Sequence, residues 1–325
     1  MRMVLATGGL AMALALGAPA AAQTAEQTEA LESFEDMIAR INLVPDTPGD
    51  GPYPALVEQD AGLPGFVVYR PADLSALAPN GLGVFVWGNG GCVADGTSSR
   101  FHLAQIASYG YLVIAPGGWR SGPDAKDPPE APRVINADGT GSASPTTAAQ
   151  LTEALDWALA EDARDTSRYH GLIDENALAA GGFSCGGVQA LTIAGDPRLD
   201  TVVVQNSGLL PDDAPRLGGM ELTKAGLAAL HTPVLYFDGG ETDIAYANGL
   251  DDYQRIDHVP VWWVNLPTGH GGSYHEPMGG RNASIVVDWL EWRLRGDASA
   301  ARTFVGANCR LCTDPEATIE YKNAD

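Results

Sequence analysis

The sequence predicts an α/β fold in which a mostly parallel central sheet carries helices on both faces. Short continuous apolar runs recur along the chain, and such runs are typical of strands that are buried on both faces. Segments with helical spacing lie between these runs, and this alternation favours a parallel sheet wrapped by helices. One run, at 177–182, leads through a Gly-x-Ser-x-Gly pattern into a helix-like segment. No linker divides this part of the chain, so we expect one domain.

The elements follow one another at regular intervals. We expect strands at 66–70, 82–87, 111–115, 177–182, 201–204, 233–237 and 259–266. We expect helices at 29–41, 101–108, 146–159, directly after 184 and at 281–295. Ser144-Pro145 precedes the third of these helices, and proline is favoured in a first helical turn. Residues 117–144 are rich in Gly, Pro, Asp and Ser and predict a long loop that could act as a partial lid.

The N-terminal region has the sequence pattern of an export signal. Arg2 supplies a positive start, residues 4–16 form an apolar run, and residues 20–22 form an A-x-A cleavage site. The run is shorter than the roughly 20 residues that a membrane span needs. The sequence thus predicts a signal peptide at 1–22, an N-terminal extension at 23–63, and a domain at 64–325 that ends in a cysteine-containing tail. We expect a secreted or periplasmic protein that does not reside in a membrane.

The charge of the chain excludes some partners. The sequence holds 41 acidic and 19 basic residues, for a net charge of −22. This balance argues against nucleic acids and anionic membrane surfaces. No G-x-G-x-x-G or P-loop pattern lies at a strand–helix junction, so no nucleotide or flavin cofactor is expected. A zinc site is not expected either, because the one C-x-x-C lacks a second C-x-x-C or paired histidines.

The pattern Gly182-Phe183-Ser184-Cys185-Gly186 has the features of a nucleophile elbow. In such an elbow a strand ends in a sharp turn, a serine stands at its apex and a helix follows. Glycines flank the serine because the turn leaves no room for side chains. The helix N-terminus beside the hydroxyl favours developing negative charge. The alternative is a glycine-rich turn with an incidental serine.

A serine nucleophile needs a base, and His270 is the best candidate. It follows the last predicted strand in the glycine loop Gly269-His270-Gly271-Gly272, at the edge of a parallel sheet where such folds keep their sites. His275 is the runner-up, and a plain surface-loop histidine is the alternative.

The base in turn needs an orienting carboxylate. Asp243 follows the preceding strand, and the turn from Gly240 allows it to curl back toward the histidine loop. Asp238 and Glu241 compete for this role, and a solvated turn acid is the alternative. The favoured chain order is Ser184, Asp243, His270, which is that of α/β-hydrolases.

The chain resembles the α/β-hydrolase superfamily, nearest to exported esterases of the dienelactone-hydrolase, cutinase and polyester-depolymerase group. The resemblance covers about residues 64–296 and rests on four motifs in the expected order: Trp87-Gly88-Asn89-Gly90-Gly91, the 182–186 elbow, Gly240-x-x-Asp243 and Gly269-His270-Gly271. The first motif departs from the usual H-G-x-G-G, because Trp87 replaces the histidine, and this departure puts the substrate subclass in doubt.

The resemblance implies an oxyanion hole made by two backbone N–H groups. One belongs to Cys185, and the other lies in the first motif, where Asn89 matches best and Gly90 is an alternative. Because both donors converge on one oxygen, we expect Cys92 and Cys185 to be neighbours and to form a disulfide, with two free buried cysteines as the alternative. Cys309 and Cys312 predict a local disulfide in the tail, as cysteines of exported chains are mostly paired.

These features together predict a serine hydrolase that cleaves small or polymeric carboxylic esters through an acyl-enzyme. A peptidase or amidase with the same triad, and a non-catalytic binding protein on the same fold, are the competing readings. Five aromatic residues are candidates to line the substrate pocket: Trp87, Trp119, Tyr246, Trp262 and Trp263. The alternative is that they belong to the core, as tryptophans on strands more often do.

Overall fold

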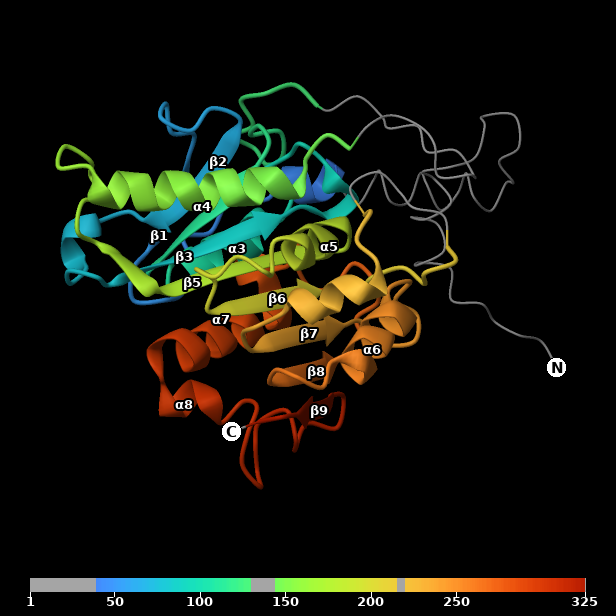
Figure 1. The fold of residues 1–325 in the computed structure, drawn as a ribbon. Coiled ribbons are helices and arrows are strands. Elements are labelled where there is room, and N and C mark those ends of the chain that lie inside the picture. Colours follow the sequence, from blue (N-terminus) through green and yellow to red (C-terminus); the bar gives the residue numbers. More distant parts are fainter. Residues whose placement is uncertain (1–38, 130–143, 215–219, 325) are drawn as a thin grey trace, which may run out of the picture.

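The structure is a computed structural model that describes residues 39–129, 144–214 and 220–324. Within these ranges the chain forms a nine-stranded sheet with the order β1-β2-β4-β3-β5-β6-β7-β8-β9 (Figure 1). The six strands from β4 to β8 are parallel, whereas β1, β2 and β9 join the edges in antiparallel pairings. The predicted mixed α/β architecture with a mostly parallel sheet is therefore present.

The strands are β1 (Ala55–Glu58), β2 (Phe66–Pro71), β3 (Leu82–Gly88), β4 (Tyr111–Pro116), β5 (Ile173–Phe183), β6 (Thr201–Gln205), β7 (Val234–Asp238), β8 (Val261–Asn265) and β9 (Thr318–Lys322). The α-helices are α3 (Arg100–Ala107), α4 (Ala148–Ala163), α5 (Cys185–Thr192), α6 (Tyr246–Arg255), α7 (Gly280–Arg295) and α8 (Ala298–Ala301). Short 3₁₀ turns are η1 (Leu74–Ala76), η2 (Gly90–Cys92), η3 (Lys224–Ala229) and η4 (Pro277–Gly279).

Helices cover both faces of the sheet, and each face has its own hydrophobic core. On one face α4, α5 and α6 pack over alternate strand residues, and on the other α3 and α7 do so, with α8 packed on α7 (Figure 1). Every residue of the parallel strands β3, β4 and β6 is buried, as expected for strands covered on both sides. In α7, Ile285 and Trp289 are buried against the sheet, while Trp292 is partly exposed.

The structure differs from the sequence-based expectation mainly at the edges of the sheet. Part of the N-terminal extension forms β1, and the C-terminal tail forms β9, although neither segment was predicted as a strand. Both strands are short and only partly buried, so they lack the apolar run that marks a central strand. Their pairing depends on an open neighbouring edge, which the local sequence does not reveal.

Two predicted helices begin or lie elsewhere than expected. Helix α4 begins at Ala148 instead of Thr146, because Thr147 and Gln150 form a capping box at its start. Of the helix predicted at 29–41, only the last residues are described, and residues 39–42 are helical. The signal peptide predicted at 1–22 lies outside the described residues. In the part of the chain that is described, no helix is long and apolar enough to cross a membrane.

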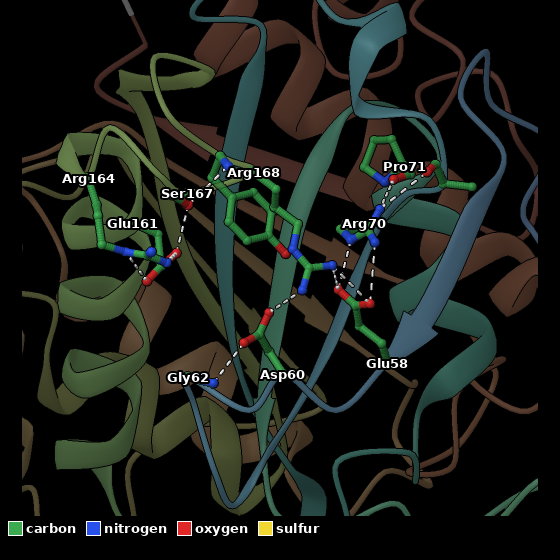
Figure 2. Close-up of polar contacts among 11 residues, drawn as sticks. Glu58, Asp60, Gly62, Arg70, Pro71, Glu161, Arg164, Ser167 and Arg168 are labelled. Atoms are coloured by element: carbon green, nitrogen blue, oxygen red, sulfur yellow. Dashed lines mark hydrogen bonds and ion pairs between the residues drawn. The ribbon is translucent and has the colours of Figure 1, made fainter.

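A group of ion pairs, here the Glu58 cluster (Glu58, Asp60, Arg70 and Arg168), ties β1 to β2 and to the connection between α4 and β5. Figure 2 shows Arg168 between the two carboxylates, with its nitrogens 3.0 Å from Glu58 and 2.9 Å from Asp60. Arg70 Nε donates to the same Glu58 carboxylate over 2.8 Å. The cluster fastens the edge strand β1, in which every residue is only partly buried.

Candidate active site

Ser184 stands at the sharp turn between β5 and α5. Its backbone has φ 54° and ψ −121°, a conformation that a residue with a side chain rarely adopts and that is common at functional sites. The two flanking glycines are sterically required, because a Cβ on Gly182 would collide with Gly186 and a Cβ on Gly186 with Gly88. Ser184 therefore stands on a sharp strand–turn–helix junction of the kind that the sequence predicted, with a half-buried hydroxyl at a helix N-terminus.

A hydrogen-bonded chain runs from this hydroxyl through an imidazole to a carboxylate. His270 Nε2 lies 3.0 Å from Ser184 Oγ, and His270 Nδ1 lies 2.6 Å from Asp243 Oδ1. A carboxylate only accepts, so Nδ1 carries the proton and Nε2 is free to accept from the serine hydroxyl. We call these three hydrogen-bonded side chains the Ser184–His270–Asp243 chain. It brings together three residues that the sequence nominated from segments far apart.

Asp243 is held as a carboxylate by its surroundings. Burial raises its pKa, but the hydrogen bond and charge of His270, the Ala245 amide and the Asn206 amide outweigh burial, so the net pKa is lowered. Its two oxygens accept from backbone N–H groups, Oδ1 from Ala245 and Oδ2 from Gly239, both over 2.9 Å. The predicted turn is present, because Asp243 N–H donates to Gly240 O over 2.8 Å.

The competing candidates for the carboxylate and the base lie in other environments. Asp238, the last residue of β7, is fully buried and accepts from Trp263 Nε1 over 2.6 Å. Burial, together with the nearby charge of Asp243, raises the pKa of Asp238 well above its usual range, and it does not bond a histidine. Glu241 is exposed to solvent. His270, and not His275, contacts Ser184 Oγ.

The glycine motif after β3 meets the start of α5. The side chain of Asn89 is buried and donates to Val93 O over 2.9 Å and to Pro116 O over 2.7 Å, which spans the loop and fastens it to the end of β4. The backbone of Gly88 and Asn89 packs directly on Gly186, with no room for a Cβ between them. The amides of Asn89 and Cys185 therefore lie in the same region, beside Ser184.

Both predicted disulfides are present. Cys92 bonds Cys185, with the two Cα atoms 5.3 Å apart, and Cys309 bonds Cys312 in the tail. The first disulfide links the loop of Asn89 to the residue that follows Ser184. Its surroundings are polar and buried: Gln189 Nε2 donates to Thr146 O over 2.9 Å and lies 3.0 Å from Cys92 Sγ.

The aromatic residues proposed as pocket lining belong mainly to the core. Trp87, Trp119, Trp262 and Trp263 are each at most 6% exposed. Tyr246 is partly buried and packs edge-on against Trp263. The ring of Phe183 instead packs beside the histidine, with its centroid 5.1 Å from that of His270.

The end of β6 makes contacts with the candidate site that the sequence did not predict. Gln205 O accepts from Ser184 N–H over 3.0 Å, and Ser207 Oγ donates to Ser184 O over 2.6 Å. Asn206, between them, donates to Asp243. The signal is present in the sequence, because the apolar run 202–204 ends abruptly in three polar residues, just as the strand reaches the edge where the other site residues lie.

Within the described ranges, no group of three or more His, Cys, Asp or Glu side chains is placed to hold a metal ion. Comparison with known sequences adds nothing to this geometry: no protein-family model matches the chain, and no curated protein matches it significantly. The class of the protein therefore has to be argued from the Ser184–His270–Asp243 chain itself.

Proposed function

We propose that this protein is a serine hydrolase of the α/β-hydrolase type that cleaves carboxylic esters through an acyl-enzyme. The observation that carries the proposal is the Ser184–His270–Asp243 chain, with its 3.0 Å and 2.6 Å links, on a strained turn at a helix N-terminus. The order of the three residues and their position beyond the carboxyl ends of β5, β7 and β8 support the α/β-hydrolase type.

The proposed reaction begins with proton transfer. His270 Nε2 takes the proton of Ser184 as its oxygen attacks the ester carbonyl carbon, and Asp243 holds the imidazole and stabilises its positive charge. The carbonyl oxygen becomes an oxyanion that accepts from the amides of Cys185 and Asn89, with Gly90 as the alternative second donor. The C–O bond to the alcohol then breaks, and the alcohol leaves with the proton from His270.

Water completes the cycle. His270 removes a proton from water, the hydroxide attacks the acyl-serine carbonyl, and the acid is released as Ser184 regains its proton. Every proton in this sequence passes through Nε2, and no co-reactant besides water is consumed. The Cys92–Cys185 disulfide supports these reaction steps by keeping the Asn89 loop against the first turn of α5.

The test is active-site labelling followed by a substrate panel. A fluorophosphonate probe should label the protein, and Ser184→Ala should abolish labelling. Ser284→Ala is the matched control, because this exposed hydroxyl on α7 donates to a carbonyl of its own helix, away from Ser184. Esters of varied acyl and alcohol size, assayed with amides of the same acyl groups, then define the reaction. Absence of labelling, or cleavage of the amides alone, would overturn the proposal.

A further inference from the structure

Asn206 occupies a central place among the segments that form the candidate site. It follows β6, which lies in the sheet between β5 and β7, the strands that lead to Ser184 and to the Asp243 turn. Its side chain is fully buried, and its backbone φ of 45° lies in the left-handed region that asparagine tolerates better than most residues. A buried polar side chain on such a backbone requires a set of partners.

The amide nitrogen of Asn206 joins two loops. Nδ2 donates to Asp243 Oδ2 over 2.8 Å and to Gly269 O over 3.1 Å. Gly269 directly precedes His270, so one group contacts both the carboxylate and the backbone that carries the imidazole. The two loops are also in direct backbone contact, since Gly269 N–H donates to Gly239 O over 2.7 Å. A Cβ on Gly239 would collide with the Gly269 carbonyl oxygen at 2.0 Å and would lie 2.8 Å from Asn206 Nδ2, so the two loops and the amide are closely packed here.

The amide oxygen is anchored on its other side. Tyr274 OH donates to Asn206 Oδ1 over 2.7 Å, and Tyr274 is itself buried against the ring of Phe183, with centroids 4.6 Å apart. The orientation of the amide is therefore determined, because the Asp243 carboxylate and the Gly269 carbonyl can only accept and must face the nitrogen. Tyr274 lies four residues beyond His270, so Asn206 holds the histidine loop at two points.

We propose that Asn206 is a positioning residue that keeps Asp243 and the His270 loop in one fixed relation, with Tyr274 holding its amide in orientation. This inference rests on the proposed function. Without the amide, Asp243 Oδ2 would keep only the Gly239 N–H and could rotate away from His270 Nδ1. Displacements of about 1 Å at a catalytic group can lower turnover about 100-fold.

The first experiment compares Asn206→Ala with Asn176→Ala. Asn176 is an exposed asparagine near the start of β5 whose side chain bonds Asp174, so it controls for the substitution itself. For an ester that the wild type hydrolyses, kcat of Asn206→Ala should fall roughly 10- to 100-fold with KM nearly unchanged. The low-field proton resonance of the His270 Nδ1–H should move upfield or be lost. Asn176→Ala should change neither quantity.

Two further variants separate the hydrogen bonds from simple packing. Asn206→Asp preserves the size of the side chain but replaces a donor by an acceptor and faces Asp243 with a second carboxyl group, so kcat should fall at least as far as in Asn206→Ala. Tyr274→Phe keeps the ring against Phe183 and removes only the anchoring hydroxyl, so its loss should be smaller and of the same kind. If Asn206→Ala does not fold, these two variants, checked by circular dichroism, carry the test.

The outcomes distinguish the two proposals. If the wild type is not labelled at Ser184 by a fluorophosphonate, the proposed function fails. If the wild type is labelled and active, but the folded Asn206 variants retain wild-type kcat, the positioning role alone is wrong. A fall in kcat without any change in the imidazole proton resonance would also overturn it, because a purely structural contribution would act without disturbing the His270–Asp243 bond.

Discussion

Two polar clusters in this molecule join segments that are distant in sequence, and they do so in different ways. The Glu58 cluster uses long charged side chains, and Arg168 in it is 46% exposed at its side chain. The Ser184–His270–Asp243 chain uses short side chains and backbone amides, and His270 and Asp243 are at most 5% exposed. Water can replace lost partners in the first cluster but not in the second. A substitution of Arg168 should therefore be mild, and a substitution in the buried Ser184–His270–Asp243 chain should be severe.

The largest effect is expected for Asp243→Asn. An amide in place of the carboxylate can donate to His270 Nδ1 and so favours the wrong tautomer, in which Nε2 carries the proton. Turnover of an ester should fall about 10⁴-fold, as measured from initial rates at saturating substrate. Asp257→Asn is the matched control, because Asp257 is 90% exposed and should leave the rate unchanged. Loss of less than about tenfold would mean that Asp243 does not orient the base.

The two disulfides extend the comparison from hydrogen bonds to covalent links. Cys92 and Cys185 are 93 residues apart in sequence, whereas Cys309 and Cys312 are three apart. A cross-link that closes the longer loop removes more entropy from the unfolded chain, so the double variant Cys92→Ala/Cys185→Ala should lose about 2 to 4 kcal/mol in urea unfolding.

Activity should separate these two disulfides even more clearly. The Cys92→Ala/Cys185→Ala variant should also hydrolyse esters more slowly, because the Asn89 loop loses its covalent link to α5. The Cys309→Ala/Cys312→Ala variant should keep its turnover and lose less stability. Equal losses for both variants, in stability and in rate, would show that the first disulfide has no special relation to the site.

The pH dependence of the free energy of unfolding tests the effect of burial on the pKa of His102. This histidine is fully buried on α3 against the rings of Trp87 and Tyr274, and burial lowers its pKa from 6.5 to about 3. The folded pKa lies below the unfolded value, so the unfolded chain binds the extra proton between about pH 6.5 and 3. The contribution of His102 to the free energy of unfolding is therefore fully present above pH 6.5, and it is lost as the pH falls toward 3.

The measurement is the free energy of unfolding in urea at several pH values. Titration of His102 should contribute a loss of about 1.4 kcal/mol for each pH unit below 6.5. His102→Gln should remove this contribution, so the difference in stability between wild type and variant should shrink as the pH falls. His170→Gln, at a side chain that is 49% exposed, is the control. A difference that stays constant from pH 7 to 4.5 would contradict the lowered pKa.

The smallest effect is expected for Arg168→Ala in the Glu58 cluster. Exposed ion pairs contribute about 0 to 1 kcal/mol, and salt screens them. The free energy of unfolding should fall by less than about 1 kcal/mol, and the difference should shrink further at high salt. Arg70→Ala should cost more, because that side chain is only 9% exposed. A loss for Arg168→Ala that exceeds the loss for Arg70→Ala would refute this ranking by burial.

The sequence alone carried enough information to nominate the central strands and the Ser184–His270–Asp243 chain. Buried strands such as 111–115 are continuous apolar runs, and the elbow glycines are required by local sterics around Ser184. Both signals are local, so they can be read without the fold. His270 and Asp243 were found because each follows a strand, and the ends of parallel strands meet at one edge.

Only the tertiary structure decided the features that depend on partners from elsewhere in the chain. The edge strands β1 and β9 have weak patterns of their own and form because β2 and β8 offer open edges. The sequence favoured Asp243 over Asp238 but left both open, and only the fold shows that the carboxylate of Asp243 is the one that reaches His270 Nδ1. The role of Asn206 depends on the Asp243 and Gly269 loops, which both accept from its amide nitrogen and which only the fold brings together. A hydrogen bond needs a partner at about 3 Å in the right direction, and folding alone determines that geometry.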